Sequence, residues 1–161
     1  MNELKALADD PWNPQPKAWF ERRFKDARPV HCVPMAEALT ASQMALLTQV
    51  GYRPEKKECF KNATLLVDYA HFYGFEKEVR YVEGLTLDPA LALHVSIEHA
   101  WVRVGDKYID PTVERCLKAD VTKWEYVALI EKDWKGLLEV LNETECYGDV
   151  YRHEFIKSLT K

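Results

Sequence analysis

Apolar residues recur at helical spacing along much of the N-terminal half of the chain. Residues 16–27 place three aromatic side chains at this spacing and begin with a proline, which suits a first helical turn. Residues 34–50 repeat the pattern and are followed by a glycine and a proline, so we expect one helix there. Residues 59–74 predict a third helix that ends at Gly74, since glycine is favoured just after a helix.

Beyond the third helix the pattern changes to period two, which is typical of strands. β-branched and aromatic residues dominate this region. Gly105 and Asp106 indicate a tight turn between the second and third apolar runs, so these two runs should form a hairpin. The four strands are predicted over residues 77–87, 93–104, 107–113 and 125–131.

The two ends of the chain complete the predicted layout. Residues 133–143 and 151–159 return to a helical pattern, whereas residues 1–16 contain several prolines and are expected to form an extended arm. Helices, then antiparallel strands, then helices indicate an α+β fold with segregated elements. With 161 residues, of which 47% are hydrophobic and 12% aromatic, the chain is predicted to fold as a single domain over residues 1–161.

Composition narrows the classes of partner. The formal net charge of −4 gives no electrostatic reason to expect nucleic acid or an anionic membrane. The first ten residues lack the apolar stretch of a secretory signal, and no run is long and apolar enough to span a bilayer. The four cysteines include no Cys-x-x-Cys pair and fit no zinc-site spacing, so we expect reduced thiols, a cytoplasmic location and no metal. Two structural disulfides are the alternative if the protein is exported. We also expect no cofactor.

Three residues in the middle of the chain have the types and the order of a nucleophile, a base and an orienting carboxylate. Cys59 lies near the start of the third predicted helix, where backbone N–H groups favour a thiolate. Pro54 would also suit a helix start, so local rules leave the exact first residue open. His99 lies on the second strand and Asp110 at the end of the third, so the hairpin brings their side chains together.

Four short strings around these residues resemble the transglutaminase-like superfamily, which has a papain-like fold. In that superfamily a cysteine at the head of a helix is followed by Arg-Tyr-x-x-Gly, then His-Ala-Trp, then Asp-Pro-Thr. The combination is also similar to that of small uncharacterised proteins of bacteria and phages. The strings occur here in the same order, at Cys59 and at residues 80–84, 99–101 and 110–112, so the resemblance covers residues 55–115.

The resemblance implies a catalytic triad. Cys59 would be the nucleophile, His99 the general base and acid, and Asp110 the residue that orients the imidazole. Family members often have a glycine two residues before the cysteine, where this chain has Lys57. An upstream tryptophan or glutamine completes the oxyanion hole in related enzymes. The candidates for that position in this chain are Trp19, Gln43 and Gln49.

Two more side chains are candidates for substrate binding or oxyanion stabilisation, together with Gln49. Asn62 lies one helical turn after Cys59, and it either bonds the backbone near the cysteine or belongs to the surface. Trp101 lies on the same strand face as His99, where it either shields the imidazole from water or packs as a core aromatic.

Two functional hypotheses follow. The first is a thiol-dependent hydrolase or acyltransferase that cleaves an amide bond, in a peptide or a glutamine side chain, through a thioester. Its partner would be a protein or peptide substrate, and hydrolysis is favoured because water outnumbers amines in the cytosol. The second is a transglutaminase-like binding module with weak or absent catalysis, such as a phage or bacterial effector or inhibitor that binds a protein.

Overall fold

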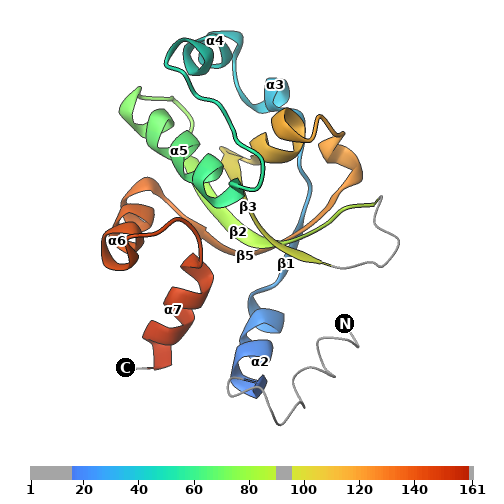
Figure 1. The fold of residues 1–161 in the computed structure, drawn as a ribbon, viewed down its shortest axis with the longest axis vertical. Helices are drawn as coiled ribbons and strands as arrows, with labels where there is room; N and C mark the ends of the chain where they lie inside the picture. The colour runs from blue at the N-terminus through green and yellow to red at the C-terminus, as the bar shows by residue number, and fades with distance from the viewer. Residues whose placement is uncertain (1–15, 90–95, 160–161) are drawn as a thin grey trace.

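The computed structural model describes residues 16–89 and 96–159, and at its centre lies one antiparallel five-stranded sheet (Figure 1). The strand order across the sheet is β1-β5-β2-β3-β4. Residues 1–15 of the predicted arm and residues 93–95 of the second predicted strand lie outside the described residues. The strands are β1 (Arg28–Val30), β2 (Val79–Leu87), β3 (Ile97–Val104), β4 (Lys107–Ile109) and β5 (Glu125–Lys132).

Helices precede, interrupt and follow the strands, so the predicted α+β class is confirmed in general terms. Over the described residues, none of the helices combines the length and the apolar character needed to cross a membrane. A π-helical turn and a 3-10 turn connect β4 with β5. The helical elements are α2 (Pro16–Asp26), α3 (Met35–Ala38), α4 (Ala41–Gln49), α5 (Cys59–Phe72), the π turn (Thr112–Cys116), the 3-10 turn (Val121–Lys123), α6 (Trp134–Thr144) and α7 (Val150–Leu159).

The sheet curls until the chain after β1 meets the opposite edge strand. Cys32 forms an isolated parallel bridge with Tyr108 of β4, and the Val33 N–H donates to the Tyr108 carbonyl at 2.8 Å. Alternate residues along each strand therefore pack in two separate clusters. We call the concave side, which contains Trp101, the inner face, and the side that contains Val102 the outer face.

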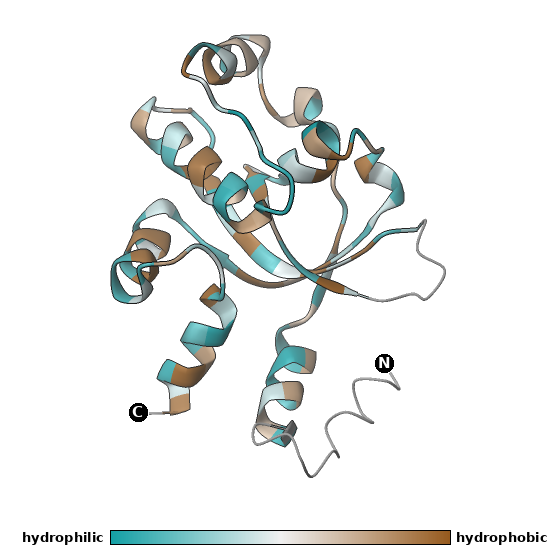
Figure 2. Ribbon diagram, viewed as in Figure 1, coloured by the Kyte–Doolittle hydropathy of each residue, from teal (hydrophilic) through white to brown (hydrophobic). Residues whose placement is uncertain are grey.

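The outer face is covered by α5, which lies across β2 and β3 (Figure 1). Leu66 and Val67 of this helix are fully buried in the same cluster as Val102 of β3. Figure 2 colours parts of α5 as hydrophobic, and the buried residues of the helix include Ala63, Leu66, Val67 and Ala70. This packing fixes the position of the helix, and therefore of its first residue, relative to β3.

The single helix predicted over residues 34–50 is wrong, because the chain forms two helices there. Leu39 and Thr40 are extended between α3 and α4. Thr40 caps α4 through a reciprocal pair of hydrogen bonds: its hydroxyl accepts from the Gln43 N–H at 3.1 Å, and the Gln43 side chain accepts from the Thr40 N–H at 2.9 Å. This capping box starts a new helix inside a continuous apolar pattern.

The third predicted strand, over residues 107–113, is too long. β4 ends at Ile109, and Pro111 introduces the π turn because proline has no N–H for a ladder bond. Strand β1 was not predicted, since it has only three residues and one of them is Pro29. It pairs with β5 at the edge of the sheet, the position that tolerates a proline.

A β-bulge lies beside the residues of interest on β2. The register between β2 and β5 shifts between Glu83 and Gly84, so Leu129 has no partner across the ladder. A Cβ atom on Gly84 would lie 2.0 Å from the Val127 carbonyl oxygen and 3.0 Å from Trp101. Only glycine fits this close approach of β2 to β5, and Gly84 is the residue directly opposite His99 on β3.

Candidate active site

The β3–β4 hairpin holds a buried pair of histidine and carboxylate. The strands pair as far as Val102↔Ile109, and the chain then leaves the sheet at Asp110. His99 Nε2 lies 2.7 Å from Asp110 Oδ2. Asp110 is completely buried and His99 is 7% exposed. The two side chains therefore meet, as the hairpin prediction requires.

Asp110 is held by three further hydrogen bonds. Its Oδ1 accepts from the N–H groups of Thr112 and Val113, both at 3.1 Å. Its Oδ2 accepts from the Tyr126 hydroxyl at 2.9 Å as well as meeting His99. Neither oxygen is left unpaired, which is the condition under which a carboxylate can be buried at acceptable cost. The carboxylate therefore has a fixed orientation toward the imidazole.

Cys59 is the first residue of α5, so the helix begins at the cysteine rather than at Pro54. The preceding residue, Glu58, makes no side-chain hydrogen bond to the helix. The N–H groups of the first turn therefore remain open to an anion. The thiol is half-buried, and its interaction with His99 is one of the influences that raise the pKa of the imidazole.

The surroundings of His99 raise its pKa. Burial by itself would lower the pKa of His99, but the charge of Asp110, the hydrogen bond to it and the interaction with Cys59 raise that pKa to about 10. Since Asp110 occupies Nε2, Nδ1 is the ring nitrogen left for the sulfur. His99 therefore lies between the buried Asp110 carboxylate and the Cys59 thiol.

The backbone just before the nucleophile has an unusual conformation. Lys57 has a φ of 64°, in the left-handed region that favours glycine. A lysine there costs about 1–2 kcal/mol relative to a right-handed conformation. The position where the transglutaminase-like pattern often has glycine thus keeps the backbone geometry that glycine would suit, although the side chain differs.

Asn62 bonds the backbone near the cysteine, which was one of the two roles expected for it. Its amide nitrogen donates to the Glu55 carbonyl at 2.8 Å and to Thr112 Oγ1 at 2.9 Å, and its Oδ1 accepts from the Glu55 N–H at 2.9 Å. The side chain is 2% exposed. Asn62 therefore ties the loop before Cys59 to the turn after Asp110, and its polar atoms are engaged there.

Trp101 is completely buried in the inner-face cluster and stacks near His99, with ring centroids 6.1 Å apart and planes 22° apart. It also meets the Tyr126 ring at 5.1 Å. Trp101 therefore packs in the core and also covers one side of the His99 imidazole. Its indole Nε1 is buried and has no hydrogen-bond partner among the described residues.

The other oxyanion candidates have different environments. Gln49 is exposed at the C-terminal end of α4, and the Gln43 side chain is used in the capping box of that helix. Trp19 packs edge-on against Phe155 of α7, with ring centroids 4.9 Å apart. The open N–H groups at the head of α5 are the donors that the described structure places next to Cys59.

Sequence reasoning missed Tyr126. It lies on β5, is 2% exposed, and donates to Asp110 across the inner face. Its ring is also close to Cys32, and burial together with the charge of Asp110 raises the pKa of both side chains. An aromatic residue in a predicted strand is an ordinary core residue, so nothing local in the sequence distinguished it.

Among the described residues, no three His, Cys, Asp or Glu side chains come together as metal ligands would. Comparisons of the chain with protein-family models, with curated proteins and with solved structures found no match.

Proposed function

We propose that the protein is a thiol-dependent hydrolase or acyltransferase that acts on an amide bond through Cys59, His99 and Asp110. One observation carries the proposal: a half-buried cysteine at the head of a helix interacts with a histidine whose other nitrogen is bonded to a buried carboxylate. The sequence resemblance to transglutaminase-like proteins points to the same chemistry, and a papain-like arrangement of helix and sheet is part of the proposal.

The first half of the reaction forms a thioester. The Cys59 thiolate attacks the amide carbonyl carbon, and the oxygen takes up the electron pair as an oxyanion facing the N–H groups of the first turn of α5. When this intermediate collapses, the C–N bond breaks and the leaving amine takes a proton from His99 Nδ1. The acyl group stays on the sulfur, and His99 is left neutral.

The second half returns the enzyme to its starting state. His99 Nδ1 removes a proton from water while the water oxygen attacks the thioester carbonyl. The C–S bond then breaks, which releases a carboxylic acid and restores the thiolate and the imidazolium. An amine in place of water would give transamidation by the same steps. Protein or peptide is the proposed substrate class, and hydrolysis is the proposed outcome because water is in excess.

Alkylation of Cys59 tests the proposal, because iodoacetamide reacts with thiolates rather than thiols. We expect Cys59 to react at pH 6 about 100-fold faster than the exposed Cys146 of the same chain. Peptide mapping by mass spectrometry reports both rates in one sample. Substitution of His99 by glutamine should bring the Cys59 rate down to that of Cys146. Equal rates for the two cysteines in the wild-type protein would overturn the proposal.

A binding module without turnover is the second candidate, and one observation favours it. Gln43 and Trp19 are engaged elsewhere and Gln49 is exposed on α4, so none of the three expected side chains completes an oxyanion hole beside Cys59. A fast-reacting Cys59, combined with release of product from a peptide library, supports the enzyme. A slow Cys59 and retention of an intact peptide support the binding module.

A further inference from the structure

A cavity of about 240 Å³ lies close to His99 along the sheet. Two of its wall residues are the strand neighbours of His99: Glu98 precedes it on β3, and Gly84 lies opposite it on β2. The remaining wall comes from α2, β5 and the start of α7. The residues that line the cavity are Trp19, Phe20, Arg23, Glu83, Gly84, Glu98, Leu129, Asp149, Tyr151 and Arg152.

The opposite wall of this cavity also approaches the nucleophile. Asp149 follows Gly148, which packs so closely on Phe60 that an added Cβ would lie 2.8 Å from the Phe60 ring. Phe60 is the residue after Cys59, so the loop before α7 lies against the head of α5. A substrate whose carbonyl reaches Cys59 would therefore place a neighbouring residue at this cavity.

Arg23 is a polar group of the cavity with unused hydrogen-bonding capacity, and Arg152 is the second arginine of the lining. Its side chain is 12% exposed, and its guanidinium lies over the Trp19 ring with Cζ 5.4 Å from the centroid. Its Nε is buried and has no hydrogen-bond partner among the described residues. The nearest carboxylate, on Glu98, is 4.0 Å from Nη2, which is too long for a hydrogen bond.

The buried acidic residue of the cavity does not compete for Arg23. Glu83 accepts from the Tyr81 hydroxyl at 2.5 Å and from the N–H groups of Val150 and Tyr151 at 3.1 and 3.0 Å. Its oxygens therefore hold the start of α7. Glu98 is 63% exposed at its side chain and can turn into solvent, which leaves the Arg23 guanidinium able to bind an incoming charge. The other charged lining residues, Asp149 and Arg152, are exposed.

We propose that this cavity is a specificity subsite that accepts an acidic side chain of the substrate, with Arg23 as the residue that binds its carboxylate. The proposal rests on the function proposed above. The free guanidinium donors suit a carboxylate, which arginine binds with two parallel hydrogen bonds. Phe20 and Leu129 supply apolar wall for the methylene groups of a glutamate. The volume is below that of pockets for drug-sized ligands and suits one residue.

Peptidyl vinyl sulfones test the subsite without knowledge of the natural substrate. Three dipeptide probes are compared that differ only in having Glu, Gln or Lys next to the reactive group, and their rates of Cys59 modification are measured by mass spectrometry. We expect the Glu probe to react at least tenfold faster than the Gln probe, and the Lys probe to be slowest. In Arg23→Gln the advantage of the Glu probe should disappear.

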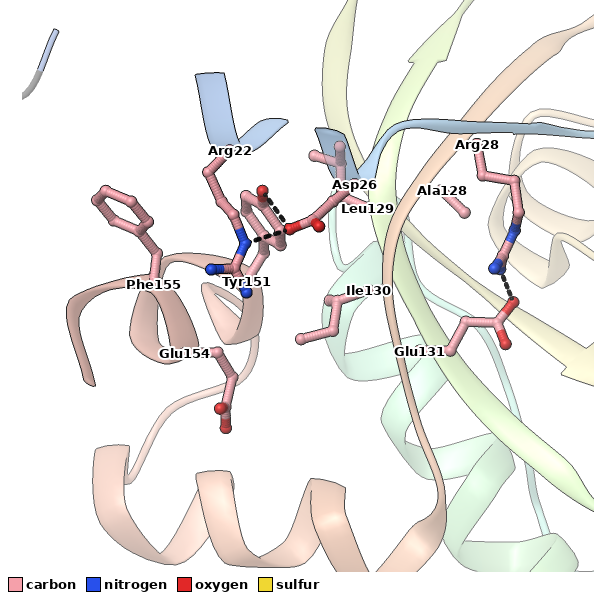
Figure 3. A pocket seen from close by; sticks show the side chains of 10 residues that line it. All are labelled: Arg22, Asp26, Arg28, Ala128, Leu129, Ile130, Glu131, Tyr151, Glu154 and Phe155. Carbon is pink, nitrogen blue, oxygen red and sulfur yellow. Dashed lines mark hydrogen bonds and ion pairs between the residues drawn. The ribbon is translucent and has the colours of Figure 1, made fainter. Parts of the chain in front are cut away.

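Matched variants separate the subsite from general electrostatics. Arg22 is the neighbouring residue on α2, but its Nε is already bonded to Asp26 Oδ2 at 2.7 Å in a different cavity (Figure 3). Arg22→Gln removes the same charge and should leave the preference for the Glu probe intact. Glu98→Gln removes the nearest competitor and should increase that preference. If Arg23→Gln fails to fold, Arg23→Lys takes its place, with a reduced but measurable preference expected.

The possible outcomes separate the two proposals. Equal rates for the Glu and Gln probes, or an equal loss of preference in Arg22→Gln and Arg23→Gln, overturn the subsite. So does failure of every probe to modify a Cys59 that iodoacetamide alkylates rapidly. If iodoacetamide also alkylates Cys59 no faster than Cys146, the proposed function fails and the subsite fails with it.

Discussion

The inner face of the sheet carries a polar cluster at each end, and the two clusters differ in what they leave open. β3 points His99, Trp101 and Arg103 to the same side, so the histidine and the arginine flank the buried tryptophan. We call the cluster around His99 and Asp110 the site cluster. The cluster around Arg103 and Glu131 is the distal cluster.

The distal cluster is closed. Glu131 Oε1 accepts from Arg28 at 2.6 Å and from the Tyr108 hydroxyl at 2.5 Å, while its Oε2 accepts from Arg103 at 3.0 Å. Burial would raise the pKa of Glu131, but the hydrogen bonds from Tyr108 and Arg103 and the charge of Arg28 lower it. Both carboxylate oxygens are bonded within the cluster, which is what a purely structural network requires.

The site cluster also pairs a buried carboxylate with a basic side chain, but one ring nitrogen of its histidine is not bonded to the carboxylate. Asp110 is as fully bonded as Glu131, yet its partner is a histidine that contacts it through Nε2 alone. Asp110 and Cys59 together raise the pKa of His99, against the effect of burial, to about 10. The distal cluster therefore only holds strands together. The site cluster also contains a basic side chain that interacts with a thiol.

Asp110→Asn should have the largest effect. It removes the charge that keeps His99 protonated against burial, so the pKa of His99 falls and the Cys59 thiolate loses its partner. We expect the alkylation rate of Cys59 at pH 7 to drop about 100-fold and the free energy of unfolding to drop by about 3 kcal/mol. Alkylation kinetics and urea unfolding measure the two. A wild-type alkylation rate in this variant would refute the role given to Asp110.

The pH dependence of stability tests the same difference between the site cluster and the distal cluster. The pKa of His99 is raised in the folded protein to about 10, against about 6.5 when unfolded. The stabilisation from protonated His99 is therefore complete below about pH 6.5 and is lost as the pH rises through about 10. The difference in unfolding free energy between the wild type and His99→Gln should shrink over this range. A difference that is constant with pH would show that His99 carries no stabilising charge.

Glu131→Gln should have an intermediate effect that is confined to stability. The neutral amide cannot match the three donors of the distal cluster, so we expect a loss of about 2 kcal/mol in unfolding free energy. The alkylation rate of Cys59 should stay within twofold of the wild type. If Cys59 slows as much as in Asp110→Asn, the two ends are coupled and the distinction between them is lost.

Tyr126→Phe should have the smallest effect. It deletes one hydrogen bond to Asp110 Oδ2 and leaves the ring packing with Trp101 in place. The expected loss is about 1–2 kcal/mol in unfolding free energy, with Cys59 alkylation slowed only a few-fold because Asp110 keeps its charge. Differential scanning calorimetry and alkylation kinetics are the measurements. A loss of reactivity as large as that of Asp110→Asn would show that the Tyr126 hydroxyl is needed to keep His99 protonated.

The parts of the site that could be predicted were those set by local pattern. The period-two run and the Gly105 turn were enough to bring His99 and Asp110 together, and the helical run from Cys59 gave the position of the thiol. Tyr126 could not be predicted in the same way, because its contact depends on β5 lying across a curled sheet from β4.

Where the predicted helices and strands were wrong, capping and long-range interactions had determined the structure. The pattern of residues 34–50 did not reveal that Thr40 would form a capping box and divide the helix. The strand prediction extended past Ile109 because Asp110 leaves the ladder to bond His99 and the N–H groups of the following turn. The direction of Gln49 likewise depends on how α4 packs, which periodicity does not specify.

The short strand β4 affects how readily local unfolding separates Asp110 from His99. This strand has three residues, and its edge is held by one isolated bridge from Cys32 to Tyr108. Opening of so short an edge would carry Asp110 away from His99 while α5 and the long strands β2 and β3 stay folded. We therefore expect the site to belong to a cooperative unit smaller than the whole molecule. Amide hydrogen exchange at Ile109 should reveal that unit, and thiol reactivity should decline before the protein unfolds globally.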